Sequence, residues 1–243
     1  MEIEKIKGVF FDCWDTILEF HMPDEKWNIR SLMEHAVNKT EIDWEKVHLF
    51  TESFFRDYYS SRLNHELRIQ EILNLVVLQH DIHLDCDLDV CAHDILNHLS
   101  PEPVKGLDGF LSYLEMKNVP YFCLSNTVYP QDDTRKLIEK YFPEHHFSFV
   151  LSSYEVGVKK PNSLFFQVGA KKAGLDIKDC IYIGDKIYQD CYGSYKSGFG
   201  SSIYLNWKQD KEKQIASLSR LGLESFPYIE VDSYAMLMEM LGK

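Results

Sequence analysis

Short apolar runs that alternate with helical patterns dominate the chain after residue 104. The strand-like runs are residues 120–124, 147–151, 180–183, 202–205 and 228–231. Alternation of this kind is typical of a doubly wound, mostly parallel β-sheet covered by helices. A further run, Gly8-Val9-Phe10-Phe11, is apolar throughout and predicts a first strand that is buried on both faces.

The segment between the first strand and the later ones has a different pattern. Residues 27–37, 44–63 and 67–78 carry apolar side chains three and four positions apart, which predicts amphipathic helices. No run comparable to a strand occurs before Ser100-Pro101-Glu102-Pro103. We therefore predict an α/β fold in which residues 1–18 and 105–243 form a Rossmann-like core. Residues 19–104 are predicted to form an inserted all-α cap domain over the carboxyl edge of the sheet.

The charge balance limits the partners of this chain. Among the 243 residues, 38 are acidic and 26 basic, which gives a formal net charge of −12. The resulting field repels nucleic acid and anionic membranes, so the sequence predicts neither as a partner. The field also repels anionic substrates. A site for an anion would therefore need local cations or a bound metal ion.

Features that would direct the chain out of the cytoplasm are not found in the sequence. The first seven residues lack the apolar stretch of a signal peptide, and no window reaches the ~18 apolar residues of a membrane span. The six cysteines are scattered without a C-x-x-C motif. These observations predict a cytoplasmic protein in a reducing environment.

Polar residues with chemical potential follow several of the predicted strands. Asp12 ends the first strand, Ser125-Asn126 ends the run 121–124, and Gly184-Asp185 ends the run 181–183. Lys159-Lys160-Pro161 lies in a loop, and Asp190 follows Asp185 by five positions. In a parallel sheet these strand ends lie on the same edge and can converge. Carboxylates, a hydroxyl group and a lysine together can hold a divalent cation and a phosphoryl group.

In order and spacing, these segments resemble the haloacid dehalogenase (HAD) superfamily of hydrolases, and the inserted helices resemble a C1-type cap. The resemblance implies that Asp12 is the catalytic nucleophile, that Ser125 and Lys160 take part in catalysis, and that Ser125, Asn126 and Lys160 bind substrate. It also implies a Mg²⁺ site formed by Asp12, the backbone carbonyl of Trp14 and Asp185. Asp190 is expected either to ligate the metal or to orient Lys160 or a metal-bound water.

One position departs from the pattern of the family. Most phosphatases of this superfamily place a second aspartate, the general acid and base, two residues after the nucleophile, where this chain has Trp14. Asp15 comes one residue later and would face the other side of an extended strand. We expect Asp15 to hold the turn beyond Thr16 instead. The 2-haloacid dehalogenases of the superfamily also carry an aromatic residue at that position, but they use no metal and match this chain poorly around Asp185.

Two groups of histidines lie outside these motifs. Residues 80–93 contain His80, His83, Cys86, Cys91 and His93, whose spacing matches no common structural zinc site. This segment is predicted to be a solvated cap loop, with zinc as the alternative. The pair His145-His146 predicts a surface turn.

These observations lead to one functional hypothesis with two alternatives. The chain is predicted to be a Mg²⁺-dependent phosphoric monoester hydrolase that acts on a small phosphorylated metabolite through an aspartyl-phosphate at Asp12. The alternatives are a HAD-like binding or scaffold protein with little turnover and a metal-independent 2-haloacid dehalogenase. The sequence identifies neither the substrate nor the oligomeric state.

Overall fold

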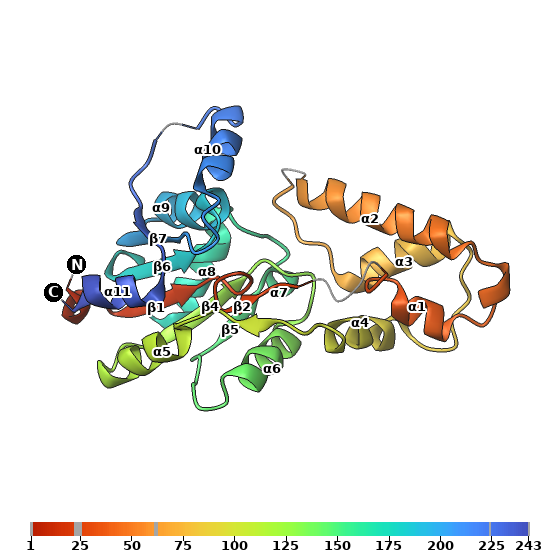
Figure 1. The fold of residues 1–243 in the computed structure, drawn as a ribbon, viewed down its shortest axis with the longest axis horizontal. Helices are drawn as coiled ribbons and strands as arrows, with labels where there is room; N and C mark the ends of the chain where they lie inside the picture. The colour runs from red at the N-terminus through yellow and green to blue at the C-terminus, as the bar shows by residue number, and fades with distance from the viewer. Residues whose placement is uncertain (1, 22–25, 61–62, 224, 243) are drawn as a thin grey trace.

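A six-stranded parallel sheet forms the centre of the computed structural model, which describes residues 2–21, 26–60, 63–223 and 225–242 (Figure 1). The strand order is β5-β4-β1-β6-β7-β8, and every neighbouring pair is parallel. The strands are β1 (Gly8–Phe11), β4 (Tyr121–Ser125), β5 (Val150–Ser152), β6 (Cys180–Gly184), β7 (Ser201–Leu205) and β8 (Ile229–Val231). The predicted α/β, Rossmann-like fold is therefore confirmed.

The side chains of β1 alternate between two apolar layers. Phe11 packs against Phe110 and Tyr234, with ring centroids 6.0 and 6.4 Å away, on the face covered by α5 and α11. Phe10 points to the opposite face and stacks on Phe122 at 4.6 Å, in the layer that includes residues of α8. All four residues of β1 are buried, as the sequence predicts.

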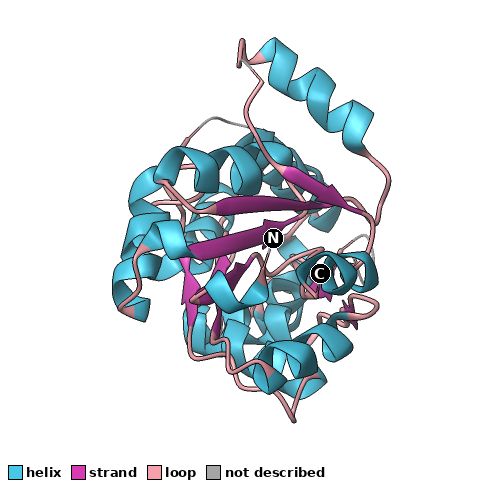
Figure 2. Ribbon diagram, turned by 90° about the vertical axis from the view of Figure 1, so that its left-hand side faces the viewer, coloured by secondary structure: helices cyan, strands magenta, loops and turns pink. Residues whose placement is uncertain are grey.

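Helices cover both faces of the sheet (Figures 1 and 2). Those that follow the return of the chain to the sheet are α5 (Leu107–Met116), α6 (Gln131–Tyr141), α7 (Ser153–Val156), α8 (Ser163–Ala173), α9 (Gly193–Ser197), α10 (Lys211–Arg220) and α11 (Tyr234–Leu241). Short 3₁₀ segments lie at Ile3–Lys5, Lys39–Glu41 and Ile177–Asp179. Between β6 and α9 the chain forms a π-helical segment, η4 (Ile187–Tyr192).

Four helices lie together to one side of the sheet (Figure 1). They are α1 (Arg30–His35), α2 (Trp44–Ser60), α3 (Ile69–Gln79) and α4 (Leu88–Asn97). Where the chain leaves the sheet and returns to it, β2 (Leu18–Glu19) pairs with β3 (Glu102–Pro103) in an antiparallel ladder. The sequence did not predict this ladder, because two-residue strands are too short to show a periodic pattern.

Two predicted elements differ in extent from those observed. The helix expected over residues 27–37 is confined to α1, because Ala36 is extended and the Val37 N–H donates to the His83 carbonyl at 2.7 Å instead of continuing the helix. The loop expected over residues 80–93 ends at α4, which contains Cys91 and His93. Among the described residues, no helix combines the length and apolar character needed to cross a membrane.

His145 is buried, so the predicted surface turn is wrong for this residue. Its side chain is 5% exposed, and its ring nitrogens lie 3.0 Å from Glu115 Oε1 and 3.1 Å from Asp108 Oδ1. Burial opposes the charged form of the ring, but both carboxylates outweigh burial and raise the pKa of His145. The histidine thus attaches the loop after α6 to α5.

This contact predicts a pH-dependent contribution to stability. A histidine whose pKa is raised by folding contributes stability below its unfolded pKa of about 6.5, and the contribution is lost as the pH rises through the folded pKa. We expect His145→Gln to lower the free energy of unfolding by on the order of 1 kcal/mol more at pH 5.5 than at pH 8.5. Urea denaturation of both proteins at the two pH values measures this difference. A loss that is equal at both values would contradict a charged His145.

Candidate active site

The carboxyl ends of β1, β4 and β6 meet at one edge of the sheet. Phe11, the last residue of β1, is in register with Cys123 of β4 and Ile183 of β6. The residues that follow these three positions in the chain therefore lie side by side. The Asp12 N–H, for example, donates to the Ile183 carbonyl at 2.8 Å. The strand order reverses at β1, which is where α/β sheets form a crevice for ligands.

Lys160 forms hydrogen bonds with two of the acids that the sequence predicts at this edge, Asp12 and Asp190. Its Nζ donates to Asp12 Oδ1 at 2.5 Å, to Asp190 Oδ1 at 2.7 Å and to the Tyr182 hydroxyl oxygen at 2.9 Å. The lysine side chain is 1% exposed. Burial opposes its charged form, but Asp12 and Asp190 outweigh this effect and hold the pKa of Lys160 well above its usual value. A buried ammonium between two carboxylates is the electrostatic centre of the site.

The Asn126 amide holds the backbone of the same lysine. Its Oδ1 accepts the Lys160 N–H at 2.8 Å, and its Nδ2 donates to the Lys160 carbonyl at 3.1 Å. Both polar atoms of the Asn126 side chain are therefore hydrogen-bonded to the loop that carries Lys160. Ser125, the preceding residue, is fully buried, and its hydroxyl oxygen has no hydrogen-bond partner among the described residues.

Asp185 lies beside this cluster. One oxygen each of Asp12, Asp185 and Asp190 lies within 4.8 Å of the other two. Burial raises the pKa of Asp185 to about 8 and that of Asp12 to about 6, although Lys186 and Lys160 oppose the respective shifts. Lys186 Nζ contacts Asp185 Oδ2, whereas Asp185 Oδ1 is buried without a partner among the described atoms.

This donor set fits a divalent cation. Mg²⁺ prefers carboxylate and carbonyl oxygens, and here an unpartnered carboxylate oxygen lies in a cluster of three buried acids. Burial disfavours the ionised forms of Asp12 and Asp185, so added positive charge would stabilise them. Asp12 and Asp185 are the carboxylates available to such an ion, because Asp190 Oδ1 and Oδ2 already accept from Lys160 Nζ and the Lys186 N–H.

Gly184 is required by the position of Asp190. A Cβ atom at residue 184 would lie 2.3 Å from Asp190 Cγ, far inside van der Waals contact. Asp190 is held there because its Oδ2 accepts the Lys186 N–H at 2.9 Å at the start of η4. The glycine before Asp185 thus allows the π-helical segment to bring a second acid against the strand end.

The chain turns immediately after Asp12. Asp15 has a φ of 59°, its Oδ1 accepts the Phe20 N–H at 3.1 Å, and its carbonyl accepts the Trp207 indole N–H at 2.7 Å. Lys208 Nζ lies 2.6 Å from the Asp15 carboxylate. Asp15 therefore holds this turn, as the sequence predicts.

A cavity of about 510 Å³ opens between the sheet edge, α2 and the segment that precedes α1. Aromatic side chains form much of its wall: the Trp14 ring lies 5.4 Å from Phe20, which lies 6.0 Å from Trp27. The other lining residues are Asp15, Asn28, Glu52, Phe55, Arg56, Asn126, Thr127, Val128 and Tyr129. Trp14 thus lies in the wall of a cavity, at the position two residues after Asp12.

Two groups near the site were not identified from the sequence. Tyr182 lies inside β6, where its apolar neighbours predict only a core residue, yet its hydroxyl accepts from Lys160 and donates to the Leu124 carbonyl at 3.1 Å. Glu66 is a single acid in a predicted helical region, yet it is buried against Ser153. No signal in a single sequence distinguishes these residues from ordinary core and surface positions.

Comparison with known proteins identifies the family. The family described as haloacid dehalogenase-like hydrolase matches residues 6–193, so the chain belongs to the haloacid dehalogenase-like hydrolases. Glyceraldehyde 3-phosphate phosphatase of Methanopyrus kandleri is 23% identical over 197 residues, which cover 79% of this chain and 81% of the relative. The enzyme of the same name from Methanocaldococcus jannaschii is 25% identical over 194 residues, with coverage of 76% and 78%.

A solved structure shares the fold. The 2-haloacid dehalogenase from Pseudomonas syringae pv. Tomato superposes with a TM-score of 0.66 at 17% identity, covering 98% of both chains. At this identity the similarity establishes the fold and leaves the reaction open. Together with the family match, it confirms the HAD resemblance drawn from the motifs.

The Lys160 contacts predict a large loss of stability when the ammonium is removed. Lys160→Met leaves Asp12 and Asp190 buried without their cation, which costs about 3–5 kcal/mol for a broken buried pair. We expect the loss at pH 7.5 to become smaller at pH 5, where Asp12 takes up a proton. Chemical denaturation at the two pH values measures it.

Lys159→Met is the matched control. Lys159 is also buried, but its carboxylate neighbour Glu66 keeps hydroxyl donors from Tyr58 and Ser153 at 2.5 Å each. Its removal should therefore cost less than that of Lys160. Equal losses in the two variants would contradict the central place given to Lys160.

Proposed function

We propose that this hydrolase is a Mg²⁺-dependent phosphoric monoester hydrolase that acts on a small phosphorylated metabolite. The observation that carries the proposal is the joint presence, at one sheet edge, of Asp12, Lys160 and two buried oxygens, Ser125 Oγ and Asp185 Oδ1, that have no hydrogen-bond partner among the described residues. A tetrahedral anion with several oxygens needs donors and cations around it, and this edge offers both. The archaeal relatives named as glyceraldehyde 3-phosphate phosphatases support a phosphorylated substrate.

In the proposed mechanism the Asp12 carboxylate attacks phosphorus. A bond forms between the Asp12 oxygen and phosphorus while the bond from phosphorus to the ester oxygen breaks, so the product leaves as an alkoxide that takes a proton from solvent, and an aspartyl-phosphate remains. Water then attacks phosphorus, releases inorganic phosphate and restores the carboxylate. Ser125 and Lys160 hold the equatorial oxygens, and Asp190 keeps the lysine oriented.

Asp12, Asp185 and the Trp14 carbonyl would hold Mg²⁺. The ion would shield the negative charge that otherwise opposes attack by a carboxylate on a phosphate. Asp190 is assigned a place outside direct coordination, because both of its oxygens already accept hydrogen bonds.

The proposal includes the division of the chain and its cellular context. We assign residues 1–18 and 105–243 to the core and residues 19–104 to a cap whose helix α2 forms part of the wall of the substrate cavity. All six cysteines are free thiols, which fits a reducing cytoplasm.

A metabolite-phosphate screen with and without Mg²⁺, repeated with Asp12→Asn, tests the function. The asparagine keeps the shape of Asp12 but removes the attacking charge, so turnover should vanish while the circular dichroism spectrum stays unchanged. Asp15→Asn is the matched control: it keeps an acceptor for the Phe20 N–H and should retain turnover. Beryllofluoride should bind at Asp12 in the natural protein.

The alternatives give different outcomes in this experiment. Chloride release from a 2-haloacid without metal would establish the dehalogenase instead. Mg²⁺ binding without turnover of any phosphate ester or anhydride would favour a binding or scaffold protein. Beryllofluoride at Asp15 would place the nucleophile there.

Trp14 predicts a steep dependence of rate on the leaving group. With no general acid at this position, the departing oxygen leaves without a donated proton, so aryl and acyl phosphates should be cleaved far faster than alkyl phosphates. Trp14→Asp should raise alkyl phosphate turnover within the ~10²–10⁴-fold range of general acid catalysis. Rates for a series of esters with different leaving-group pKa values measure both effects.

Trp14→Ala is the control, because it opens at least as much space as Trp14→Asp without adding an acid. A rise in alkyl phosphate turnover that the alanine variant shares would result from access alone. A shallow dependence on leaving-group pKa in the natural protein would show that another group donates the proton.

A further inference from the structure

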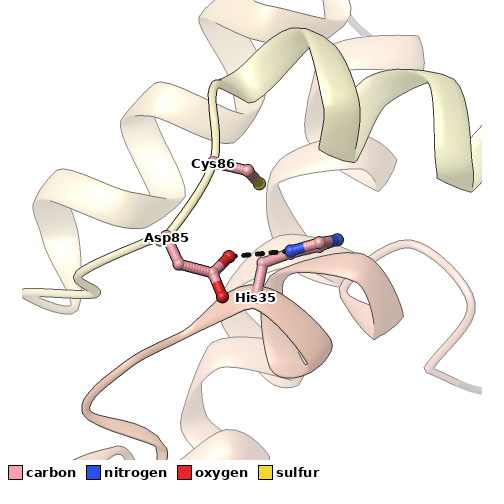
Figure 3. A group of neighbouring side chains, drawn as sticks. All are labelled: His35, Asp85 and Cys86. Atoms are coloured by element: carbon pink, nitrogen blue, oxygen red, sulfur yellow. Dashed lines mark hydrogen bonds and ion pairs between the residues drawn. The ribbon is translucent and has the colours of Figure 1, made fainter.

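A second cluster of metal-ligating side chains lies among the helices α1–α4. It consists of His35, at the end of α1, with Asp85 and Cys86 in the loop before α4 (Figure 3). One donor atom of each residue lies within 4.8 Å of the other two, and His35 Nδ1 is 2.8 Å from Asp85 Oδ1. Figure 3 shows the Cys86 sulfur extending from the loop toward the His35 ring.

The ligand set differs from the one that the sequence spacing suggested. Of the residues considered there, only Cys86 belongs to the cluster. His83 lies 3.3 Å from Asp81, and His93 lies 3.8 Å from Asp133, so both rings have other partners. His35, at the end of α1, is 50 positions away from Asp85 in the sequence, so sequence spacing could not indicate that the two residues meet.

Backbone contacts hold the two segments together without an ion. The Asp85 N–H donates to the His35 carbonyl at 3.0 Å, and the Val37 N–H donates to the His83 carbonyl at 2.7 Å. Between these bonds, Ala36 and Leu84 form an antiparallel bridge. Because the backbone fixes both segments, little ordering is needed to bring the side chains to a common ion.

The other nitrogen of His35 has a partner of the kind found around metal sites. Nε2 lies 3.3 Å from Asp94 Oδ2, and the Ser31 hydroxyl donates to the same oxygen at 3.2 Å. Both ring nitrogens contact a carboxylate, so a cation between Nδ1 and Asp85 would replace the proton that these two groups share, while Asp94 keeps a proton on Nε2. Metal-ligating histidines commonly have this arrangement.

Cys86 lies beside a second thiol and within reach of solvent. Its sulfur lies 3.7 Å from the sulfur of Cys91. Cys86 is half-buried and the Asp85 side chain is 59% exposed, so an ion can reach the cluster from solvent.

We propose that His35 Nδ1, Asp85 and Cys86 bind a Zn²⁺ ion, with water as the fourth ligand. Imidazole, thiolate and carboxylate are the ligands that zinc takes in proteins, whereas Mg²⁺ and Ca²⁺ select oxygen ligands alone. The ion would join α1 to the segment that begins α4. This site is separate from the acidic cluster at the sheet edge, and its presence does not depend on the proposed phosphatase activity.

Cobalt absorption tests the site. The metal-free full chain, kept reduced with a phosphine, is titrated with Co²⁺. We expect a thiolate-to-cobalt charge-transfer band that saturates at one ion per chain and disappears when one equivalent of Zn²⁺ is added. Cobalt at the carboxylates of the sheet edge gives no thiolate band, so Asp185→Asn should leave the band unchanged.

Variants assign the ligands. Cys86→Ser and His35→Gln should each abolish the band or weaken Co²⁺ binding at least tenfold, while Cys91→Ser and His83→Gln should keep it. Asp94→Asn should weaken binding by about 10–100-fold through loss of the partner of the ring. Circular dichroism confirms that each variant is folded, and zinc-edge X-ray absorption of the natural protein should show a single sulfur ligand.

Two results would overturn the proposal. One is the absence of a charge-transfer band at saturating Co²⁺ in the reduced protein. The other is a band that persists in Cys86→Ser, because it would arise from another thiol.

Discussion

The structure of the sheet edge depends on one buried ammonium group. Lys160 Nζ has three N–H donors and three acceptors, on Asp12, Asp190 and Tyr182, so its hydrogen-bonding capacity is filled. Burying a cation costs several kcal/mol unless its partners compensate for the lost water, and the two carboxylates do so here. The lysine therefore fixes the positions of β1, β6 and η4 relative to one another. Under the proposed function, this full set of bonds limits how Lys160 can act: an incoming phosphoryl oxygen would have to share a donor or displace an acceptor, and the neutral Tyr182 oxygen is held less strongly than either carboxylate.

The turn after Asp12 gathers basic side chains within an acidic chain. The net charge is −12, yet Lys186 and Lys208 both lie near the carboxylate of Asp15, at 3.7 and 2.6 Å, beside the Asp12 strand end. The two ammonium groups balance the negative charge of Asp15. The turn that Asp15 stabilises places Trp14 in the wall of the cavity. The position two residues after Asp12 is thus filled by an aromatic side chain, while Asp12, Lys160 and the acids that follow β6 are all present.

The sequence predicts the parts of this fold whose signals are local. Apolar strands and strand-end residues such as Asp12, Ser125 and Asp185 form patterns within a few positions, so both the sheet and the convergence of these residues were predictable. Contacts between distant segments were not. The pairing of Ala36 with Leu84 shortens a helix that periodicity predicts to be longer, and the ring of His35 meets Asp85 only after the helices assemble. Tyr182 lies inside a buried strand, so its sequence context predicts only a core residue. The role of its hydroxyl group becomes visible only when the structure places Lys160 beside it.

Glu66 links the helical part of the molecule to the loops that carry Ser125 and Lys160. Its Oε1 accepts from the Tyr58 hydroxyl of α2 and its Oε2 from the Ser153 hydroxyl, each at 2.5 Å. Ser153 Oγ in turn accepts the N–H of Thr127, two residues after Ser125, at 2.9 Å. Residues 64–66 also pair with residues 157–159: the Lys159 N–H donates to the Asn64 carbonyl and the Glu66 N–H to the Gly157 carbonyl. Because that loop continues directly into Lys160, any shift of α2 relative to the sheet has to strain or break hydrogen bonds to the loops that carry Ser125 and Lys160. The helical segment is therefore coupled to the site through buried polar bonds, in addition to the apolar contact between the two parts.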